Sequence, residues 1–468
     1  MADSSAVAWS VHELGLADFG DKRLTQRGVE LASSLLEHPQ HSIPQACQSW
    51  AATKGAYRFF SNDKVQSGKM LNAHQVQLRQ LATDFDTVLV AQDTTTLNLS
   101  NKQIAGVGSI GNGGNGGSNG GLKGLYVHTA LAMSPDGVPL GVTSQKTYAR
   151  KAETKTASYK QTVKGRPITE KETFRWVEAV TAAKAVLPDK HVVVVGDRES
   201  DIFEVFNQGR SLGVDLLVRT NQNRLLTEAD ETVRLFDKAR QGNIVTRYET
   251  DVPVDHHKTR KAVLTIRGSS MLLPPPKSRS RKEAWTSIPL TVLNVMEENP
   301  PADVEPIHWL LTTSLSVTTA AEAREKVTWY MYRWRIERFF YTLKTGAFNI
   351  EKLQFETFSR FAKAITMYSL VACRLLRTLY YERDHPLETA ENFFSHNELQ
   401  ALQLREKRRG GVFTIHEAVM AIAKLGGHLG RKSDGPPGIK AVWTGFQALQ
   451  YLVEGMLLGS QMEAQGLL

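Results

Sequence analysis

The amino-acid sequence predicts an α/β protein in which a mixed sheet stands between two helical regions. Continuous apolar runs, typical of strands buried on both faces, occupy residues 88–91 and 192–195. Between these runs, residues 125–143 have the pattern of a hairpin and residues 169–186 have the apolar spacing of a helix. The order strand, hairpin, helix, strand places strands of both directions in one sheet.

Length and composition limit the class of protein. The chain has 468 residues, 41% of them hydrophobic, so we expect about two to four domains. A formal net charge of +9 favours a polyanionic partner, although many basic proteins bind no nucleic acid. Only Cys47 and Cys373 are cysteines, which argues against a disulfide framework or zinc site and favours the reduced cytoplasm. Neither a signal peptide nor an apolar run of about 18 residues is visible, so we expect no membrane association.

Residues 1–70 are predicted to be helical, because apolar residues recur there at helical spacing. One interpretation of the polar positions between them is an ordinary solvated surface. The alternative is a domain that binds DNA phosphates. The side chains that suggest the alternative are Lys22, Arg23, Arg27, Lys54, Tyr57 and Arg58.

The remaining segments are assigned by their periodicity and their turn residues. The helix at 169–186 is expected to open with a capping box at Thr169 to Glu172. The glycine-rich tract 106–124 lacks the Gly-Lys-Ser or Gly-Lys-Thr ending of a phosphate loop and is interpreted as a flexible connection. Residues 224–306 are predicted to form an inserted β-rich unit, with strands at 248–254, 262–266 and 288–295. Helices are expected at 320–382 and again up to residue 468. The inserted unit also carries a basic cluster, Lys277, Arg279, Arg281 and Lys282.

Two aspartates are candidate ligands for a metal ion. Asp93 and Asp197 each come just after an apolar strand pattern, and ligands collect at the carboxyl ends of strands in open α/β sheets. An aspartate in this position can also simply begin a turn or cap a helix. The segment from Asp197 to Asp201 has three acids in five residues, and their mutual repulsion is tolerable when a cation neutralises it.

A second polar group is predicted on one helix. At 100° per residue, Tyr330, Arg333, Glu337 and Lys344 fall within a stripe roughly 60° wide, separate from an apolar face. The stripe is either ordinary solvated surface or part of a site. Three tryptophans in the same region, Trp309, Trp329 and Trp334, favour a surface that stacks on bases and binds phosphates.

These residues match a family pattern that extends over nearly the whole chain. The spacing Tyr330-x2-Arg333-x3-Glu337-x6-Lys344 resembles the signature of bacterial DDE transposases of the insertion-sequence-four group, most closely those of the transposon-five type. Residues 92–95 and 197–199 are similar to the two aspartate motifs of that group. Residues 20–23 and 55–59 resemble its end-recognition domain, and residues 426–443 resemble its synapsis region.

The resemblance implies a ribonuclease-H-like catalytic core over residues 71–370, a helical DNA-end-binding domain at 1–70 and a helical dimerisation domain at 371–468. It further implies that Asp93, Asp197 and Glu337 hold catalytic Mg²⁺, for which Mn²⁺ can substitute. The expected activity is cut-and-paste transposition through nicking, hairpin formation, hairpin opening and strand transfer, carried out by a homodimer on DNA. The residues expected to contact DNA near the cleavage point are Arg219, Trp309, Tyr330, Arg333 and Lys344.

Two other functions remain open at this point. One is a metal nuclease with the same core that cleaves DNA without joining strands, against which the end-recognition and synapsis segments argue. The other is a DNA-binding inhibitor or domesticated remnant without chemistry. The intact set of Asp93, Asp197 and Glu337 argues against that interpretation.

Overall fold

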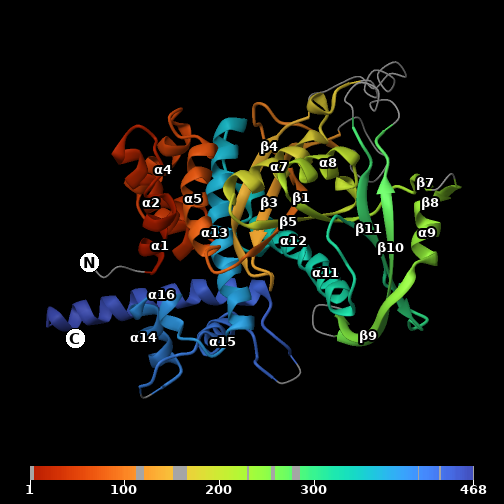
Figure 1. Cartoon of the computed structure of the whole chain (residues 1–468). Coiled ribbons are helices and arrows are strands. Elements are labelled where there is room, and N and C mark those ends of the chain that lie inside the picture. The colour runs from red at the N-terminus through yellow and green to blue at the C-terminus, as the bar shows by residue number, and fades with distance from the viewer. Residues whose placement is uncertain are drawn as a thin grey trace.

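The computed structural model describes residues 5–111, 121–150, 166–228, 231–253, 259–276, 285–408, 410–431 and 434–466 (Figure 1). The predicted basic cluster at Lys277 to Lys282 and the middle of the glycine-rich tract lie outside these ranges.

One mixed sheet forms the centre of the molecule, with the order β4, β3, β1, β5, β6. β1 pairs antiparallel with β3 and parallel with β5, and β5 pairs parallel with β6. This order is that of a ribonuclease-H-like core, and the predicted mixed α/β fold is confirmed. The bounds of these strands are β1 (Thr87–Asn98), β3 (Leu122–Met133), β4 (Pro139–Tyr148), β5 (His191–Gly196) and β6 (Asp215–Arg219).

Both faces of the central strands are covered, as their unbroken apolar runs predict. Successive side chains of a strand point to opposite faces. Val90 therefore belongs to the same buried core as Trp176 on one side, while Leu89 belongs to the core that contains Phe339 on the other. The first side is covered by α7 (Phe174–Val186) and α8 (Phe203–Leu212), and the second by α12 (Trp334–Tyr341) and α13 (Phe358–Asp384).

The first strand is longer than its apolar run. We expected Asp93 just past the end of this strand, and that prediction is wrong, because β1 continues to Asn98. Pairing with β3 continues through Asn98 and Gly124, and the intervening threonines are β-branched residues that suit a strand. Asp93 therefore lies in the middle of β1, where it pairs with Thr129 of β3.

The capping box predicted at Thr169 to Glu172 is also wrong. Residues Ile168–Glu170 form a separate 3-10 turn, and α7 begins only at Phe174. The Glu172 carboxylate instead accepts hydrogen bonds from the Tyr148 hydroxyl at 2.7 Å and from Arg150 Nε at 2.8 Å. A tertiary contact has replaced the local cap.

The inserted β-rich region continues the main sheet. Antiparallel pairing of β12 (His308–Thr313) with β6 extends the order through β11 (Ile288–Glu298), β10 (Thr259–Leu273) and β9 (Asn243–Pro253). The insertion also contains a small hairpin, β7 (Leu225–Glu228) with β8 (Glu231–Arg234), and one helix not predicted from the sequence, α9 (Leu235–Gln241). At the opposite edge, β2 (Gly108–Gly111) pairs with β3.

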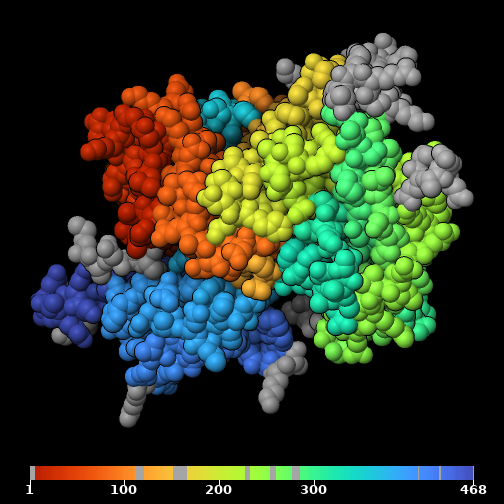
Figure 2. Space-filling view, in the orientation of Figure 1, coloured from red at the N-terminus to blue at the C-terminus, as the bar shows by residue number. Residues whose placement is uncertain are grey.

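Helices from both ends of the chain pack around α13. Figure 2 shows the N-terminal helices and the inserted strands at opposite ends of the molecule. Leu14, Phe60 and Tyr368 belong to one continuous core, so the N-terminal helices share their interior with α13. These helices are α1 (Ser5–Leu14), α2 (Lys22–Glu37), α3 (Ile43–Cys47), α4 (Trp50–Ser61) and α5 (Ser67–Leu81).

The C-terminal region is helical, as predicted. It consists of α14 (His396–Arg405), α15 (Ile415–Leu425) and the long helix α16 (Ile439–Ala464), preceded in the chain by α11 (Ala320–Tyr332), α12 and α13. The amide of Gln48 donates to Glu454 on α16 at 2.9 Å, which brings the two ends of the chain together. Among the helices that the structure describes, none combines the length and apolar character needed to cross a membrane.

Candidate active site

The two candidate aspartates lie on neighbouring parallel strands. Gln92 of β1 is in register with Gly196 of β5, so the residues that follow them, Asp93 and Asp197, are adjacent across the sheet. The side chain of Asp93 is 18% exposed and accepts a hydrogen bond from the Thr94 amide at 2.7 Å. Asp197 caps the 3-10 turn Arg198–Ser200 and accepts from the Glu199 amide at 2.8 Å.

Glu337 reaches the same region from α12. The guanidinium of Arg333 donates to Asp93 at 3.2 Å and to Glu337 at 2.9 Å, so it bridges a strand carboxylate and a helix carboxylate. Arg333 lies between α11 and α12 in helical conformation. The predicted stripe therefore faces the sheet here, and the alternative of a solvated surface is wrong for Arg333, whose side chain is only 11% exposed.

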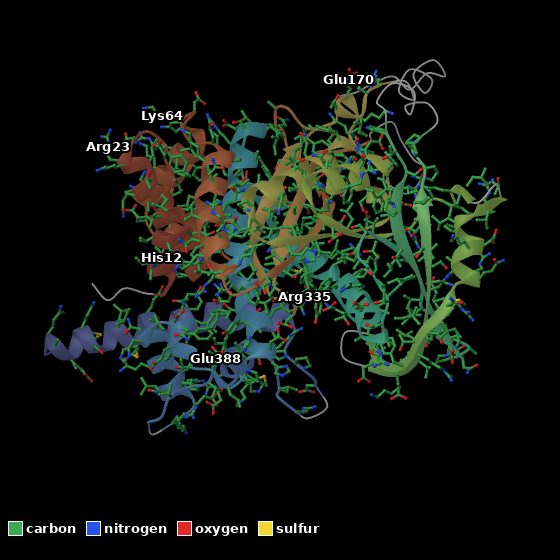
Figure 3. All side chains as sticks on the ribbon, in the orientation of Figure 1. His12, Arg23, Lys64, Glu170, Arg335 and Glu388 are labelled. Atoms are coloured by element: carbon green, nitrogen blue, oxygen red, sulfur yellow. The ribbon has the colours of Figure 1, made fainter. Side chains whose placement is uncertain are left out.

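The other two stripe residues are also held. Tyr330 is buried, and Lys344 donates from Nζ to the Thr96 carbonyl of β1 at 2.8 Å. Arg335, also on α12 and labelled in Figure 3, anchors this helix, because its guanidinium lies 4.2 Å and 4.4 Å from the ring centres of Tyr332 and Tyr380. Burial lowers the pKa of Arg335, while the two tyrosines act in the opposite direction.

Burial and the neighbouring acids raise the pKa of Asp93 to about 6, with burial the largest cause, followed by the charge of Asp197 and then that of Glu337. The Thr94 amide and Arg333 act in the opposite direction. All three candidate carboxylates thus share one electrostatic environment, in which a negative charge on Asp93 is unfavourable unless a cation is near.

The acid-rich segment after β5 is neutralised by arginines. Asp201 is buried and pairs with Arg224 at 2.6 Å, while it also accepts from the amides of Asn221 and Gln222. Glu199 pairs with Arg175 at 2.7 Å. Arginines therefore neutralise two of the three acids, Glu199 and Asp201. Asp197 remains as the candidate metal ligand of this segment.

The three candidate ligands, Asp93, Asp197 and Glu337, have the type of donor atom that suits a divalent cation. Carboxylate oxygens are the ligands that Mg²⁺ and Mn²⁺ prefer. Within the described parts of the chain, no three His, Cys, Asp or Glu side chains are arranged closely enough to hold a metal ion as they stand. At this site the bridge made by Arg333 joins Asp93 to Glu337, so a metal ion that binds both carboxylates must displace that guanidinium.

Arg219 and Trp309 lie beside this centre. Arg219 ends β6 and donates to the His308 carbonyl of β12 at 3.3 Å. Trp309 lies within β12, half-buried, with its ring 5.8 Å from the ring of Tyr330 at an angle of 59°. Trp309 is therefore neither fully buried in the core nor fully exposed, because one part of its ring packs beside Tyr330.

The N-terminal candidates lie far along the chain from these carboxylates. Arg23 is 91% exposed and bonded to Asp21, and Figure 3 shows it pointing away from the helices. Arg27 lies against Gly55 of α4, where an added Cβ would come within 3.0 Å of its guanidinium. Lys22 is exposed.

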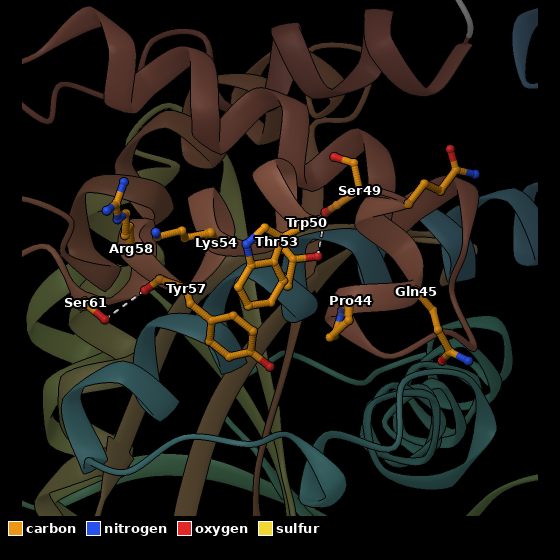
Figure 4. Close-up of a pocket in the computed structure, with 10 residues that line it drawn as sticks. Pro44, Gln45, Ser49, Trp50, Thr53, Lys54, Tyr57, Arg58 and Ser61 are labelled. Atoms are coloured by element: carbon orange, nitrogen blue, oxygen red, sulfur yellow. Dashed lines mark hydrogen bonds between the residues drawn. The ribbon is translucent and has the colours of Figure 1, made fainter.

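The surface of α4 forms a pocket that the sequence only partly revealed. Lys54, Tyr57 and Arg58 line it together with Trp50, whose ring is 80% exposed (Figure 4). Trp50 was missed, although the spacing Trp50, Lys54, Arg58 at every fourth residue places all three on one side of a helix. An exposed tryptophan among cations suits a base or sugar surface.

Comparisons with known proteins match three families in chain order. Residues 6–65 match the family described as transposase DNA-binding, residues 136–374 match the transposase DDE domain, and residues 370–464 match the transposase Tn5 dimerisation domain. Asp197 and Glu337 lie inside the DDE match, and Asp93 precedes it.

One solved structure is similar over much of its length. The cryo-EM structure of a piggyBac transposase synaptic complex with hairpin DNA matches with a TM-score of 0.37 and 9% identity, covering 96% of this chain and 78% of that chain.

The transposase DDE domain accounts for just over half of the chain, between a DNA-binding match and a dimerisation match. DNA binding, dimerisation and dependence on a divalent metal ion accompany that membership. The predicted resemblance is confirmed: this chain belongs to the DDE transposases, as a Tn5-like member of the insertion-sequence-four group.

Proposed function

We propose that this enzyme is a cut-and-paste transposase in which Asp93, Asp197 and Glu337 hold Mg²⁺, with Mn²⁺ able to substitute. The observation that carries the proposal is the convergence of three carboxylates from β1, the end of β5 and α12, where burial and the charges of the other two acids raise the pKa of Asp93 to about 6. A divalent ion bound there activates the attacking oxygen and stabilises the leaving oxygen in phosphoryl transfer.

The surrounding cations have distinct tasks in this proposal. Arg333 exchanges its carboxylate partners for a DNA phosphate when the metal ion binds. Lys344 and Arg219, both anchored on backbone carbonyls, present positive charge beside the cleavage point. Tyr330 joins these cations in holding phosphates, and the neighbouring ring of Trp309 holds a displaced base by stacking during hairpin formation.

Recognition of the transposon ends is assigned to residues 1–70, and assembly of the synaptic homodimer to residues 371–468. The cations and the ring for the ends are Lys22, Arg23, Arg27, Tyr57 and Arg58. Trp50 and Lys54 join Tyr57 and Arg58 in the pocket beside α4. Residues 71–370, with the insertion at 224–306, form the catalytic domain in this division. The enzyme works on bacterial DNA in the cytoplasm.

The test is a transposition reaction with purified protein, Mg²⁺ and linear DNA that carries the inverted repeats flanking the gene. Nicked ends, hairpins, an excised fragment and joined target DNA are expected in that order. Nicks without joined products would favour the nuclease, and binding without any cleavage would favour the inactive remnant.

A further inference from the structure

A buried hydrogen-bond network lies behind Asp93, on the face of the sheet that α7 covers. Gln92 and Thr94 flank Asp93 in β1, so their side chains point to the opposite face from its carboxylate. The Thr94 hydroxyl lies 2.9 Å from Nδ1 of His128, and Nε2 of His128 lies 3.3 Å from the Gln92 amide oxygen. Gln92 and His128 are buried.

Arg175, on α7, is the cation of this network. Its Nε donates to the Thr94 hydroxyl at 3.1 Å, its Nη2 to Glu199 at 2.7 Å, and its Nη1 to the Glu172 carbonyl at 2.9 Å. Only 7% of its side chain is exposed. A buried arginine is costly unless each of its donors is matched, and these three partners come from different elements.

The partners of Arg175 are neighbours of both candidate metal ligands. Thr94 follows Asp93, and its amide donates to the Asp93 carboxylate. Glu199 follows Asp197 by two residues, and its amide donates to the Asp197 carboxylate. One guanidinium therefore connects the side chains of the two residues whose backbone amides donate to the two aspartates.

The hydrogen-bond directions in the network are mutually consistent. Because Arg175 has only donors, the Thr94 oxygen accepts from it and the hydroxyl hydrogen is free to donate to Nδ1 of His128. Nε2 then carries the ring proton and donates to Gln92. Burial, with the charge of Arg175, lowers the pKa of His128 to about 3, which keeps the ring in this neutral form.

We propose that Arg175 is a positioning residue of the transposase, which sets the spacing of Asp93 and Asp197 by holding Thr94 and Glu199 together. It touches neither aspartate side chain and takes no part in the chemistry. Partners in this outer layer orient metal ligands, and their loss commonly weakens metal binding about 10- to 100-fold. The inference rests on the proposed metal site.

Because Arg175 is positively charged, its replacement distinguishes an effect of charge on cation binding from an effect of positioning. Removal of a positive charge from the neighbourhood of a cation site strengthens cation binding if charge alone matters. Loss of positioning weakens it. Arg175→Gln therefore moves the affinity for Mn²⁺ in opposite directions under the two explanations.

The experiment is a titration of the full-length protein with Mn²⁺, in which free Mn²⁺ is followed by its electron paramagnetic resonance signal. We expect Arg175→Gln to bind Mn²⁺ about 10-fold more weakly, and Arg175→Lys to recover only part of the loss, because an ammonium group cannot match three separated acceptors in one plane. Thr94→Val removes the same connection without a change of charge and keeps the strand-forming shape, so it decides the question if Arg175→Gln does not fold.

Matched controls separate positioning from general stability. Arg260→Gln breaks another arginine–carboxylate pair, between the partly buried Arg260 of β10 and the buried Glu297 of β11; β10 is four strands away from β5 in the sheet order. Thr312→Val removes another buried hydroxyl bond, with Thr220 at 2.7 Å. Both controls are expected to lower the melting temperature and to leave Mn²⁺ affinity unchanged.

Two results would overturn the inference in distinguishable ways. If Asp93→Asn and Asp197→Asn lose Mn²⁺ binding but Arg175→Gln and Thr94→Val bind as tightly as the unchanged protein, the positioning role is wrong and the proposed function stands. If Asp93→Asn and Asp197→Asn bind Mn²⁺ normally, the proposed metal site is wrong and the positioning role is wrong with it.

Discussion

Arg333 and Asp93 form an ion pair at 3.2 Å across 240 positions of sequence, joining the junction of two helices to the middle of the central strand. The same guanidinium holds Glu337 at 2.9 Å. A protein cation thus lies where the negative charge of the site is concentrated. At the proposed metal site, binding of the ion and release of Arg333 would therefore be linked.

The first prediction follows from that linkage. In the absence of DNA, Arg333→Ala should bind Mn²⁺ more tightly than the unchanged protein, because the carboxylates lose a competing cation. With transposon-end DNA and Mg²⁺, the same variant should cleave more slowly, since a phosphate contact is lost. Titration with Mn²⁺ and a cleavage assay measure the two effects. Weaker Mn²⁺ binding without DNA would mean that Arg333 supports the carboxylates rather than competing for them.

The second prediction concerns the carboxylates themselves. Replacement of Asp93, Asp197 or Glu337 by Ala should abolish strand cleavage, because each supplies an oxygen ligand to the metal ion. Binding of transposon ends, which is assigned to residues 1–70, should stay within a few-fold. Gel-shift and cleavage assays on the same DNA test both statements. A variant that still cleaves in Mg²⁺ removes its residue from the metal site.

The third prediction is a pH dependence of stability from His128. Its folded pKa of about 3 lies below the usual histidine value of 6.5, so the unfolded chain takes up a proton between these values and the folded chain does not. Stability is therefore lost as the pH falls from 6.5 towards 3, by up to about 1.4 kcal/mol per pH unit from this residue. Because other groups titrate as well, the quantity to measure is the difference from His128→Gln in urea unfolding at several pH values. A difference that does not change between pH 7 and 4 contradicts the prediction.

The fourth prediction concerns the pocket on α4. Lys54→Ala and Arg58→Ala should each weaken binding to transposon ends and lower the salt dependence of binding by about one counterion per lost phosphate contact. Arg79→Ala, an exposed arginine on α5, is the matched control. Point substitutions are preferable to removal of residues 1–60, because Phe60 packs against Phe355 inside the shared core. Equal losses for the control would place end recognition elsewhere.

The sequence predicted those elements whose residue pattern lies within one short segment of the chain. The apolar runs at 88–91 and 192–195 form parts of β1 and β5. The motif from Tyr330 to Lys344 faces β1. The ends of elements were less predictable. Strand β1 continues through polar residues because β3 pairs with it. Glu172 does not cap a helix, because its carboxylate accepts hydrogen bonds from Tyr148 and Arg150.

Contacts between distant segments account for what was missed. Arg175 lies in an amphipathic helix pattern, where a single arginine ordinarily indicates solvent, and only the fold places it against Thr94 and Glu199. The continuation of the sheet through β12 depends on pairing with β6, about 90 residues earlier in the chain. Neither relationship leaves a periodic signal.

The last prediction distinguishes hairpin formation from simple nicking and concerns Trp309. Its ring is half-buried beside Tyr330, so truncation affects both packing and any stacking on a displaced base. If Trp309 holds that base, Trp309→Ala should lose about 1–3 kcal/mol of stacking and slow hairpin formation by about one to two powers of ten. First-strand nicking should continue at nearly its normal rate.

Trp309→Phe is the control, because it keeps an aromatic face and much of the packing. We expect it to recover most of the hairpin rate. The two steps are measured separately, with an intact end for nicking and a pre-nicked end for hairpin formation, alongside the melting temperature. A purely structural Trp309 would lower the melting temperature and slow both steps by the same factor. Since packing acts on the whole protein and stacking acts on one step, the ratio of the two rates, rather than either rate alone, decides whether this tryptophan holds a displaced base.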